Sequence, residues 1–260
     1  MSHAAEPVDA VDPEIPVLGP VPVVPRRRWG RPAVVSLGAL ASCAALGAWV
    51  RLQPTGLDTA LHTLAVRDRS AAVIGLARVV TEGGSTVVIW PVIAVAALTF
   101  PRSSGAARWL ASAAVAGGAA AGIGVRLLLS DMLRRPRPPA TDWATTAGGY
   151  AFPSGHTTAA TIGAGLLAWA LSRHLRGRGT RAAVWTTAVL WAGGVGVTRI
   201  VLGVHWPLDV VGGWALGTGW LLAMAAASAG ISRRGSAPAF GRQRGEPRGH
   251  PQPVQDGGPR

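Results

Sequence analysis

The sequence predicts an all-α protein, a bundle of six membrane-spanning helices, and three observations support this prediction. Hydrophobic residues make up 49% of the 260 residues and charged residues only 14%, whereas typical soluble domains have about 25% charged residues. The apolar residues gather in long runs, several of which approach the roughly 20 residues that a helix needs to cross about 30 Å of hydrocarbon. Short arginine clusters separate these runs. The length suits a single domain.

Six of the apolar runs are candidate spans, although flanking residues must lengthen the second, fourth and fifth. A further segment, residues 56–80, has apolar positions at helical spacing with Asp and Arg between them. That pattern predicts an amphipathic helix at the membrane interface and not a seventh span. The six spans are expected at approximately 33–50, 85–100, 107–129, 157–171, 182–197 and 208–229.

The two ends of the chain differ in composition from its centre. Residues 1–25 carry acidic residues among Pro and Val, without helical periodicity and without the basic-then-apolar order of a signal peptide. Residues 232–260 are rich in Gly, Pro and Arg. We therefore expect disordered tails at 1–32 and 232–260 around a six-helix membrane domain at 33–231.

The net charge of +13 rests on arginine alone, because the sequence contains no lysine. The arginines do not form one basic face interleaved with aromatic residues, so membrane topology explains them better than nucleic-acid binding. Clusters before the first span and after the second, fourth and sixth fall on one side, which the positive-inside rule makes cytoplasmic. Other arginines lie outside, so the rule is a bias here. We expect a multi-pass cell-membrane protein with both termini in the cytoplasm.

This topology places three polar segments together at the extracytoplasmic face. The first, residues 134–138, reads RRPRP and the second, residues 152–156, reads FPSGH. The third contains Thr198 and Arg199 and continues to the HWPLD of residues 205–209. Unrelated spans would have no reason to gather such groups at one level. Ionisable residues at membrane depth are usually functional.

The PSGH segment predicts an anion site at the start of the fourth span. Ser154 is a natural N-cap residue, and the amides that follow it form the positive end of a helix. Gly155 lets the backbone approach a phosphate closely. His156 then falls in the first turn, facing whatever binds there. Taken alone, the motif is equally compatible with a capped helix that carries an interfacial histidine.

The third segment adds a reactive group. His205 and Asp209 are four residues apart, so both side chains lie on one helical face. The carboxylate can then accept a proton from one imidazole nitrogen, which leaves the other nitrogen free to attack. The guanidinium of Arg199 is planar and positively charged, and it can donate two parallel hydrogen bonds to phosphate oxygens. The alternative is a snorkelling arginine beside a structural His–Asp pair.

The composition does not favour a metal cofactor. There is no cluster of carboxylates to hold Mg²⁺, and two histidines with one aspartate would make a poor zinc site beside so many arginines. The single Cys43 lies in an apolar run, which excludes a disulfide framework. We therefore expect no metal and no cofactor, and an anion held by arginines and helix-start amides.

Together the three segments resemble the signature of the PAP2 superfamily of membrane phosphatases, which reads K-x6-R-P, P-S-G-H and S-R-x5-H-x3-D. The second motif is complete at residues 153–156, and the third matches at Arg199, His205 and Asp209, with Thr198 in place of serine. The resemblance covers about residues 33–230. It implies six helices with the site on one face.

The resemblance also implies a mechanism without metal. His205 matches the family nucleophile and would form a phosphohistidine, Asp209 would orient it, and His156 would protonate the leaving alcohol. Family substrates are mostly lipid phosphates and diphosphates such as phosphatidic acid, phosphatidylglycerophosphate and undecaprenyl diphosphate. The implied phosphate ligands are Arg137, Arg199, Ser154 and the Gly155 amide.

The first motif departs from the family pattern. It matches at Arg137 and Pro138, but Ser130 stands where the lysine belongs. Arg126 lies one turn earlier on the same helical face, about 6 Å back along the axis, and we expect it to substitute. Arg134, which would approach from the loop, is the alternative.

Other functional interpretations remain open at this stage. A lipid phosphotransferase would use the same groups with an acceptor other than water. A catalytically silent membrane binding protein is suggested by Ser130, and a vanadium haloperoxidase shares the site, although six apolar spans argue against that soluble class. The expected partners are a lipid phosphate and membrane lipids. No protein partner can be inferred.

Overall fold

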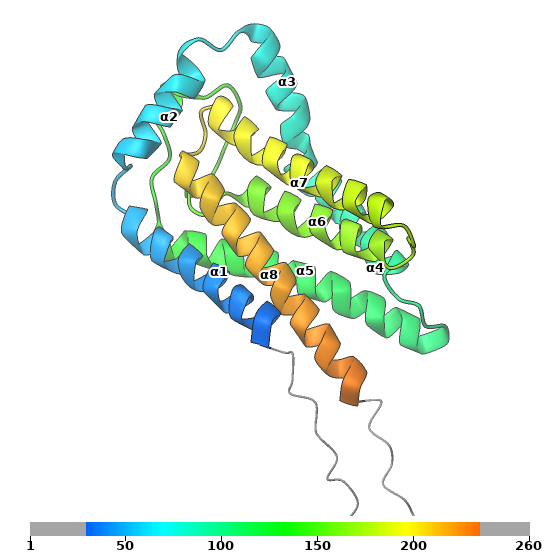
Figure 1. Cartoon of the computed structure of the whole chain (residues 1–260). Coiled ribbons are helices and arrows are strands. Elements are labelled where there is room, and N and C mark those ends of the chain that lie inside the picture. The colour runs from blue at the N-terminus through cyan, green and yellow to red at the C-terminus, as the bar shows by residue number, and fades with distance from the viewer. Residues whose placement is uncertain (1–29, 235–260) are drawn as a thin grey trace, which may run out of the picture.

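The computed structural model describes residues 30–234, which form eight α-helices and two short 3₁₀ helices, without a strand (Figure 1). The expected tails, 1–32 and 232–260, lie almost entirely outside the described residues, so the tail and domain boundaries stay predictions. The helices are α1 (Gly30–Val50), α2 (Gly56–Arg67), α3 (Ala71–Thr81), α4 (Thr86–Thr99), α5 (Gly105–Leu133), α6 (Gly155–Ser172), α7 (Arg178–Val201) and α8 (Pro207–Arg234), with η1 (Glu82–Gly84) and η2 (Ala140–Asp142).

All six expected spans are helical, but they are not equally suited to cross a bilayer. Four segments are long and apolar enough to do so. A fifth is possible if α3 with η1 and α4 form one span, bent by 43°. By itself α4 has only 14 residues. The number of spans therefore stays a prediction. The four segments are Ala33–Val50, Gly105–Leu133, Arg178–Val201 and Pro207–Ser228.

The prediction of one amphipathic helix over residues 56–80 is wrong, because two helices occupy this segment. Each has its own N-terminal cap. The hydroxyl of Thr55 accepts the amide N–H of Asp58, and the hydroxyl of Ser70 accepts the amide N–H of Val73. A serine in a capping position competes with continuation of the preceding helix, so α2 ends at Arg67 and α3 starts afresh.

Helix α6 is the centre of the bundle and packs against α4, α7 and α8. Small residues bring α8 unusually close to it. A Cβ added to Gly217 would lie 2.6 Å from the Cβ of Thr161, so only glycine fits there. On its other side, α6 places Ile162 and Leu166 against Ile89 of α4 in the main apolar core. The small-residue contact fixes the height of α6 relative to α8, and therefore the level at which their starts meet.

Helices α2 and α3 lie at one end of the bundle (Figure 1), and this end carries a layer of polar contacts. We call this layer the polar cap; it consists of α2, α3, residues 134–154 and residues 202–206. Arg69 donates to the carbonyl oxygens of Val201 and Asp142, and Arg78 donates to that of Ala144. The start of α1 and the end of α8 lie at the opposite end of the bundle (Figure 1).

Candidate active site

The turn between α7 and α8 brings His205 against Asp209, as the four-residue spacing predicts. Nδ1 of His205 lies 3.4 Å from Oδ2 of Asp209, and the same oxygen accepts the Trp206 amide N–H at 2.8 Å. Pro207 begins α8, a position where its missing N–H costs no helical bond. The carboxylate is therefore placed in the first turn of α8, facing back toward the imidazole.

The second ring nitrogen of His205 faces Arg137. Nε2 lies 3.0 Å from Nη1 of Arg137, and since arginine can only donate, Nε2 is the unprotonated nitrogen. Nδ1 then carries the proton toward Asp209. Burial, followed by the charges of Arg137 and Arg199, lowers the pKa of His205 well below 6.5. The ring is thus neutral, with its lone pair directed at the arginine.

Arg137 is held by backbone carbonyl groups. Nη1 donates to Val204 at 2.8 Å, Nε to Gly149 at 3.0 Å and Nη2 to Gly148 at 2.8 Å. These carbonyls come from two loops that are far apart in sequence. The guanidinium is therefore fixed beside His205, and no carboxylate of residues 30–234 forms an ion pair with it.

The start of α6 lies beside the same histidine. The Ser154 amide donates to the carbonyl oxygen of Asp209 at 3.0 Å, which ties α6 to α8. Ser154 occupies the N-cap position, but the expected side-chain cap is absent. Its hydroxyl instead accepts from the Thr157 hydroxyl at 3.0 Å. His156, in the first turn, is half-buried.

Two further arginines reach this region from α5 and α7. Nε of Arg126 donates to the carbonyl of Pro153 at 2.9 Å, and a Cβ added to Gly155 would lie 3.1 Å from Arg126 Cζ. Gly155 therefore leaves room for that guanidinium. Arg199 is 4% exposed and donates from Nη1 to the Thr81 hydroxyl at 3.0 Å. Its Nε is buried without a partner in the described part of the chain.

Arg134, the alternative substitute for the lysine, points elsewhere. It ends α5 in the left-handed conformation, with φ of 49°. The exposed side chain donates to the carbonyl of Asp131, and its guanidinium lies 6.0 Å from the centre of the Tyr150 ring. Ser130 itself is buried. Of the two candidates, only Arg126 contacts the start of α6.

Sequence reasoning missed two charged residues behind this site. Arg135 is fully buried, with Nη1 2.5 Å from Oδ1 of Asp209 and Nη2 2.6 Å from Oδ2 of Asp58. His62 is also buried, with Nε2 3.1 Å from Oδ2 of Asp142. The capping pattern at Thr55 signals the helix start near Asp58. No sequence pattern signals the ion pairs, because their partners lie far apart in the chain.

The groups gathered here suit an anion. Within residues 30–234, no three His, Cys, Asp or Glu side chains gather where they could hold a metal ion. The donors that face His205 are guanidinium groups and helix-start amides, both of which attract phosphate oxygens.

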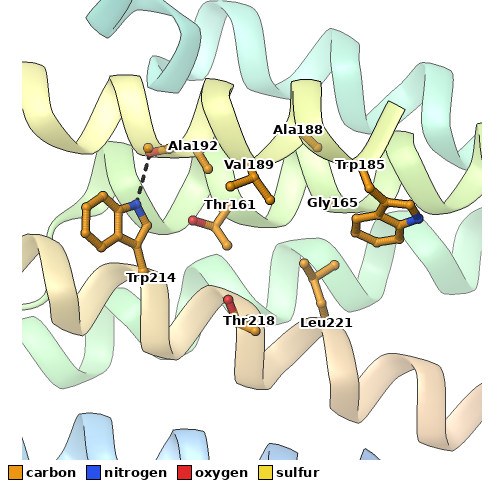
Figure 2. Close-up of a pocket in the computed structure, with 10 residues that line it drawn as sticks. Thr161, Gly165, Trp185, Ala188, Val189, Ala192, Trp214, Thr218 and Leu221 are labelled. Carbon is orange, nitrogen blue, oxygen red and sulfur yellow. Dashed lines mark hydrogen bonds between the residues drawn. The ribbon is translucent and has the colours of Figure 1, made fainter. Parts of the chain in front are cut away.

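An apolar cavity of about 430 Å³ lies between α6, α7 and α8 and opens on the surface, where Trp185 and Val189 of its lining are exposed (Figure 2). At one end Trp214 donates from Nε1 to the Ala192 carbonyl at 3.0 Å. Its ring packs over Gly196, where an added Cβ would be 2.6 Å away. The cavity lining includes Thr161, Trp185 and Leu221.

The fold and the geometry indicate a class: a multi-pass membrane protein with histidines and arginines gathered at one end of its helices. Comparison with protein families is consistent with this class, because a model of the PAP2 superfamily matches residues 105–232. Over these residues the chain resembles the PAP2 superfamily.

Individual relatives are more distant. The undecaprenyl-diphosphatase of Sulfolobus acidocaldarius is 35% identical over 72 residues, which cover 28% of this chain and only 30% of that relative. A transmembrane PAP2-type phosphatidylglycerolphosphate phosphatase from Bacillus subtilis has a similar structure, with a TM-score of 0.64 and 23% identity over 78% of this chain and 98% of that one. That likeness shows the fold. LpxE of Aquifex aeolicus aligns with a TM-score of 0.48 and 23% identity over 66% of this chain and 96% of its own.

Proposed function

We propose that this protein is a metal-independent phosphatase that hydrolyses a lipid phosphate or diphosphate through a phosphohistidine at His205. One observation carries the proposal: the unprotonated Nε2 of a neutral, buried histidine faces an arginine while Nδ1 is held by Asp209. A nucleophilic imidazole needs this tautomer and this orientation. The surrounding cations attract the phosphoryl group that it would attack.

The first step transfers the phosphoryl group to the enzyme. Phosphate oxygens bind Arg137, Arg199, Arg126 and the first-turn amides of α6, and the Arg137 N–H now on His205 Nε2 turns to an oxygen. Nε2 then attacks phosphorus, and the bond to the leaving alcohol breaks. His156 gives that alcohol its proton. Asp209 stabilises the positive ring because His205 keeps its Nδ1 proton.

The second step releases phosphate. Water attacks the phosphohistidine, with neutral His156 accepting its proton, and Nε2 regains its lone pair. Such catalysis is mainly positioning and electrostatic stabilisation. A lipid phosphotransferase would differ only in the acceptor.

The substrate class follows from the family and the membrane location. The relatives are named for undecaprenyl diphosphate and phosphatidylglycerolphosphate, and both substrates carry phosphate on a lipid alcohol. A catalytically silent binding protein is less well supported, because the nucleophile, its aspartate and the candidate acid all lie around one site.

The test of this function is phosphate release by purified protein in detergent. Phosphatidic acid, phosphatidylglycerophosphate and a polyprenyl diphosphate are offered separately, each with EDTA, and with vanadate as an inhibitor. We expect release from at least one lipid, resistance to EDTA and loss with vanadate. Failure on every lipid, or activity that disappears in EDTA and returns with Mg²⁺ or Zn²⁺, would contradict the proposal.

The proposed topology puts this site outside the cell and both termini in the cytoplasm. Its support is the arginine bias, together with the position of the polar cap opposite the start of α1 and the end of α8 (Figure 1). Single cysteines at Thr141 and Gly179, in a Cys43→Ala background, are treated with a membrane-impermeant thiol reagent on intact cells. Labelling is expected at position 141 alone. Labelling at position 179 alone would invert the topology.

A further inference from the structure

The buried charges of the polar cap converge on the carboxylate that holds the candidate nucleophile. Arg135 is 0% exposed and lies between Asp58 and Asp209, neither of which is exposed. Its two terminal nitrogens are committed to these two carboxylates. Its Nε has no partner among residues 30–234. Charges this deeply buried are costly unless they are paired, so the pairing is specific.

Asp58 is held as firmly as the arginine. Oδ2 accepts the amide and the hydroxyl of Thr55, both at 3.0 Å, in addition to Arg135. Oδ1 accepts the Leu208 amide at 2.9 Å. Leu208 immediately precedes Asp209 in the first turn of α8. Asp58 therefore fixes the first turn of α8 in two ways. It accepts the backbone amide of Leu208 directly, and it holds Asp209 through Arg135.

On this basis, we propose that Asp58 and Arg135 are positioning residues that hold Asp209, and through it His205, in the geometry for attack on phosphorus. This inference rests on the proposed function. Arg135 takes one oxygen of Asp209, which leaves the other oxygen for His205 and the Trp206 amide. The plane of the carboxylate is thereby fixed.

The charges give Asp58 a second role. The cluster of Arg135 with two aspartates carries one net negative charge, whereas Arg135 with Asp209 alone would be neutral. His205 becomes positively charged when Nε2 bonds to phosphorus and Nδ1 keeps its proton. The extra negative charge of Asp58 stabilises that state. Neither Asp58 nor Arg135 touches the phosphate, so their loss acts on the chemical step and not on binding.

The experiment compares Asp58→Asn with Arg69→Gln as a matched control. Arg69 also anchors the polar cap, but it donates to backbone carbonyls and not to Asp209. Phosphate release from the best lipid of the panel is measured as kcat and KM, alongside the melting temperature. His205→Ala serves as the inactive reference.

We expect Asp58→Asn to lower kcat about 10–100-fold, the range typical when a group that supports a metal-bound histidine is removed, with little change in KM. Arg69→Gln should lower the melting temperature and leave kcat unchanged. Wild-type kcat in Asp58→Asn, or an equal kcat loss in Arg69→Gln, would overturn the inference. If the wild-type protein releases no phosphate, or His205→Ala stays active, the proposed function fails instead.

A double-mutant cycle tests whether the two residues act as one unit. Arg135→Gln is made alone and in the Asp58→Asn background, and the effects on kcat should be strongly non-additive because the residues share one contact chain. Simple multiplication of the two losses would contradict the shared role. If Asp58→Asn does not fold, Arg135→Lys replaces it, because lysine keeps the charge but lacks the planar fork that spans both carboxylates. That variant should also lose kcat at constant KM, and wild-type kcat would overturn the proposal.

Discussion

The polar cap differs from the rest of the helices, which we call the body of the bundle, in the contacts that hold it together. The body is held by small and apolar residues, as where Gly217 meets Thr161 and where Leu166 packs in the main core. The cap is held by buried charges, above all Arg135 between Asp58 and Asp209. The body therefore sets the levels of the helix starts, and the cap sets the orientation of the reactive groups. Substitutions in the two regions should accordingly fail in different ways.

The largest effect is expected at His205, the candidate nucleophile in the cap. His205→Ala should abolish turnover of lipid phosphate, because the group that would form the bond to phosphorus is then missing. The measurement is phosphate release by protein whose folding is verified by its melting temperature. Wild-type turnover in this variant would show that His205 is not the nucleophile and that the polar cap does not carry out the reaction.

His156 is expected to matter less than the nucleophile. His156→Ala should slow turnover roughly 10²–10⁴-fold, the usual contribution of a general acid. A substrate with an acidic phenol as leaving group needs less protonation, so it should lose much less activity in this variant. Equal losses on both substrates would show that His156 does not act as the acid.

Substitutions at Arg126 test whether this residue replaces the lysine that the family motif has at the position of Ser130. Removing one fixed donor typically costs about 3–4 kcal/mol of transition-state stabilisation, so Arg126→Ala should lower kcat/KM on a lipid phosphate about 10²-fold or more. Ser130→Lys should restore much of this activity in the Arg126→Ala background. A folding defect would not be repaired in that way.

Arg134→Ala is the matched control for Arg126, since its exposed side chain lies near Tyr150 and contacts no other candidate site residue. It should have little effect on kcat/KM. A severe loss in Arg134→Ala beside a neutral Arg126→Ala would assign the substitute donor to the loop.

The smallest effect on catalysis is expected in the body. Leu166 is 0% exposed, and Leu166→Ala should cost about 2–5 kcal/mol of stability because it leaves a cavity. Its kcat should remain that of the wild type at temperatures where the protein is folded. Thermal unfolding in detergent and kcat measured on the same sample separate these outcomes. If Leu166→Ala lowered kcat as much as Asp58→Asn, the polar cap and the body of the bundle would not differ in their effect on catalysis.

Much of the bundle could be predicted from the sequence because long apolar runs mark helices directly. Each of the six expected spans is helical, with boundaries shifted by a few residues. The break between α2 and α3 was missed, although Ser70 is a capping residue, because helical periodicity continues across it. The number of spans could not be settled, since α4 has only 14 residues and is joined to α3 and η1 at a bend of 43°.

The part of the site that could be predicted is formed by residues that are close together in the sequence. His205 and Asp209 are four residues apart and do pair, although His205 lies in the turn before α8 and not on the face of that helix. Arg126 and Arg134 could not be separated by spacing alone, because the choice depends on where α6 starts relative to α5. Arg135 and Asp58 are 77 residues apart, and no periodicity predicts that contact. Only the folded cap brings them together.

The most direct test of the central claim is to trap the phosphorylated enzyme. A lipid phosphate labelled on phosphorus is mixed rapidly with purified protein, the reaction is quenched in base, and the labelled peptide is sequenced. The account predicts an acid-labile, base-stable label on His205 that is absent from His205→Ala. A label on another residue, or lipid phosphate turnover without any phosphohistidine at His205, would contradict it.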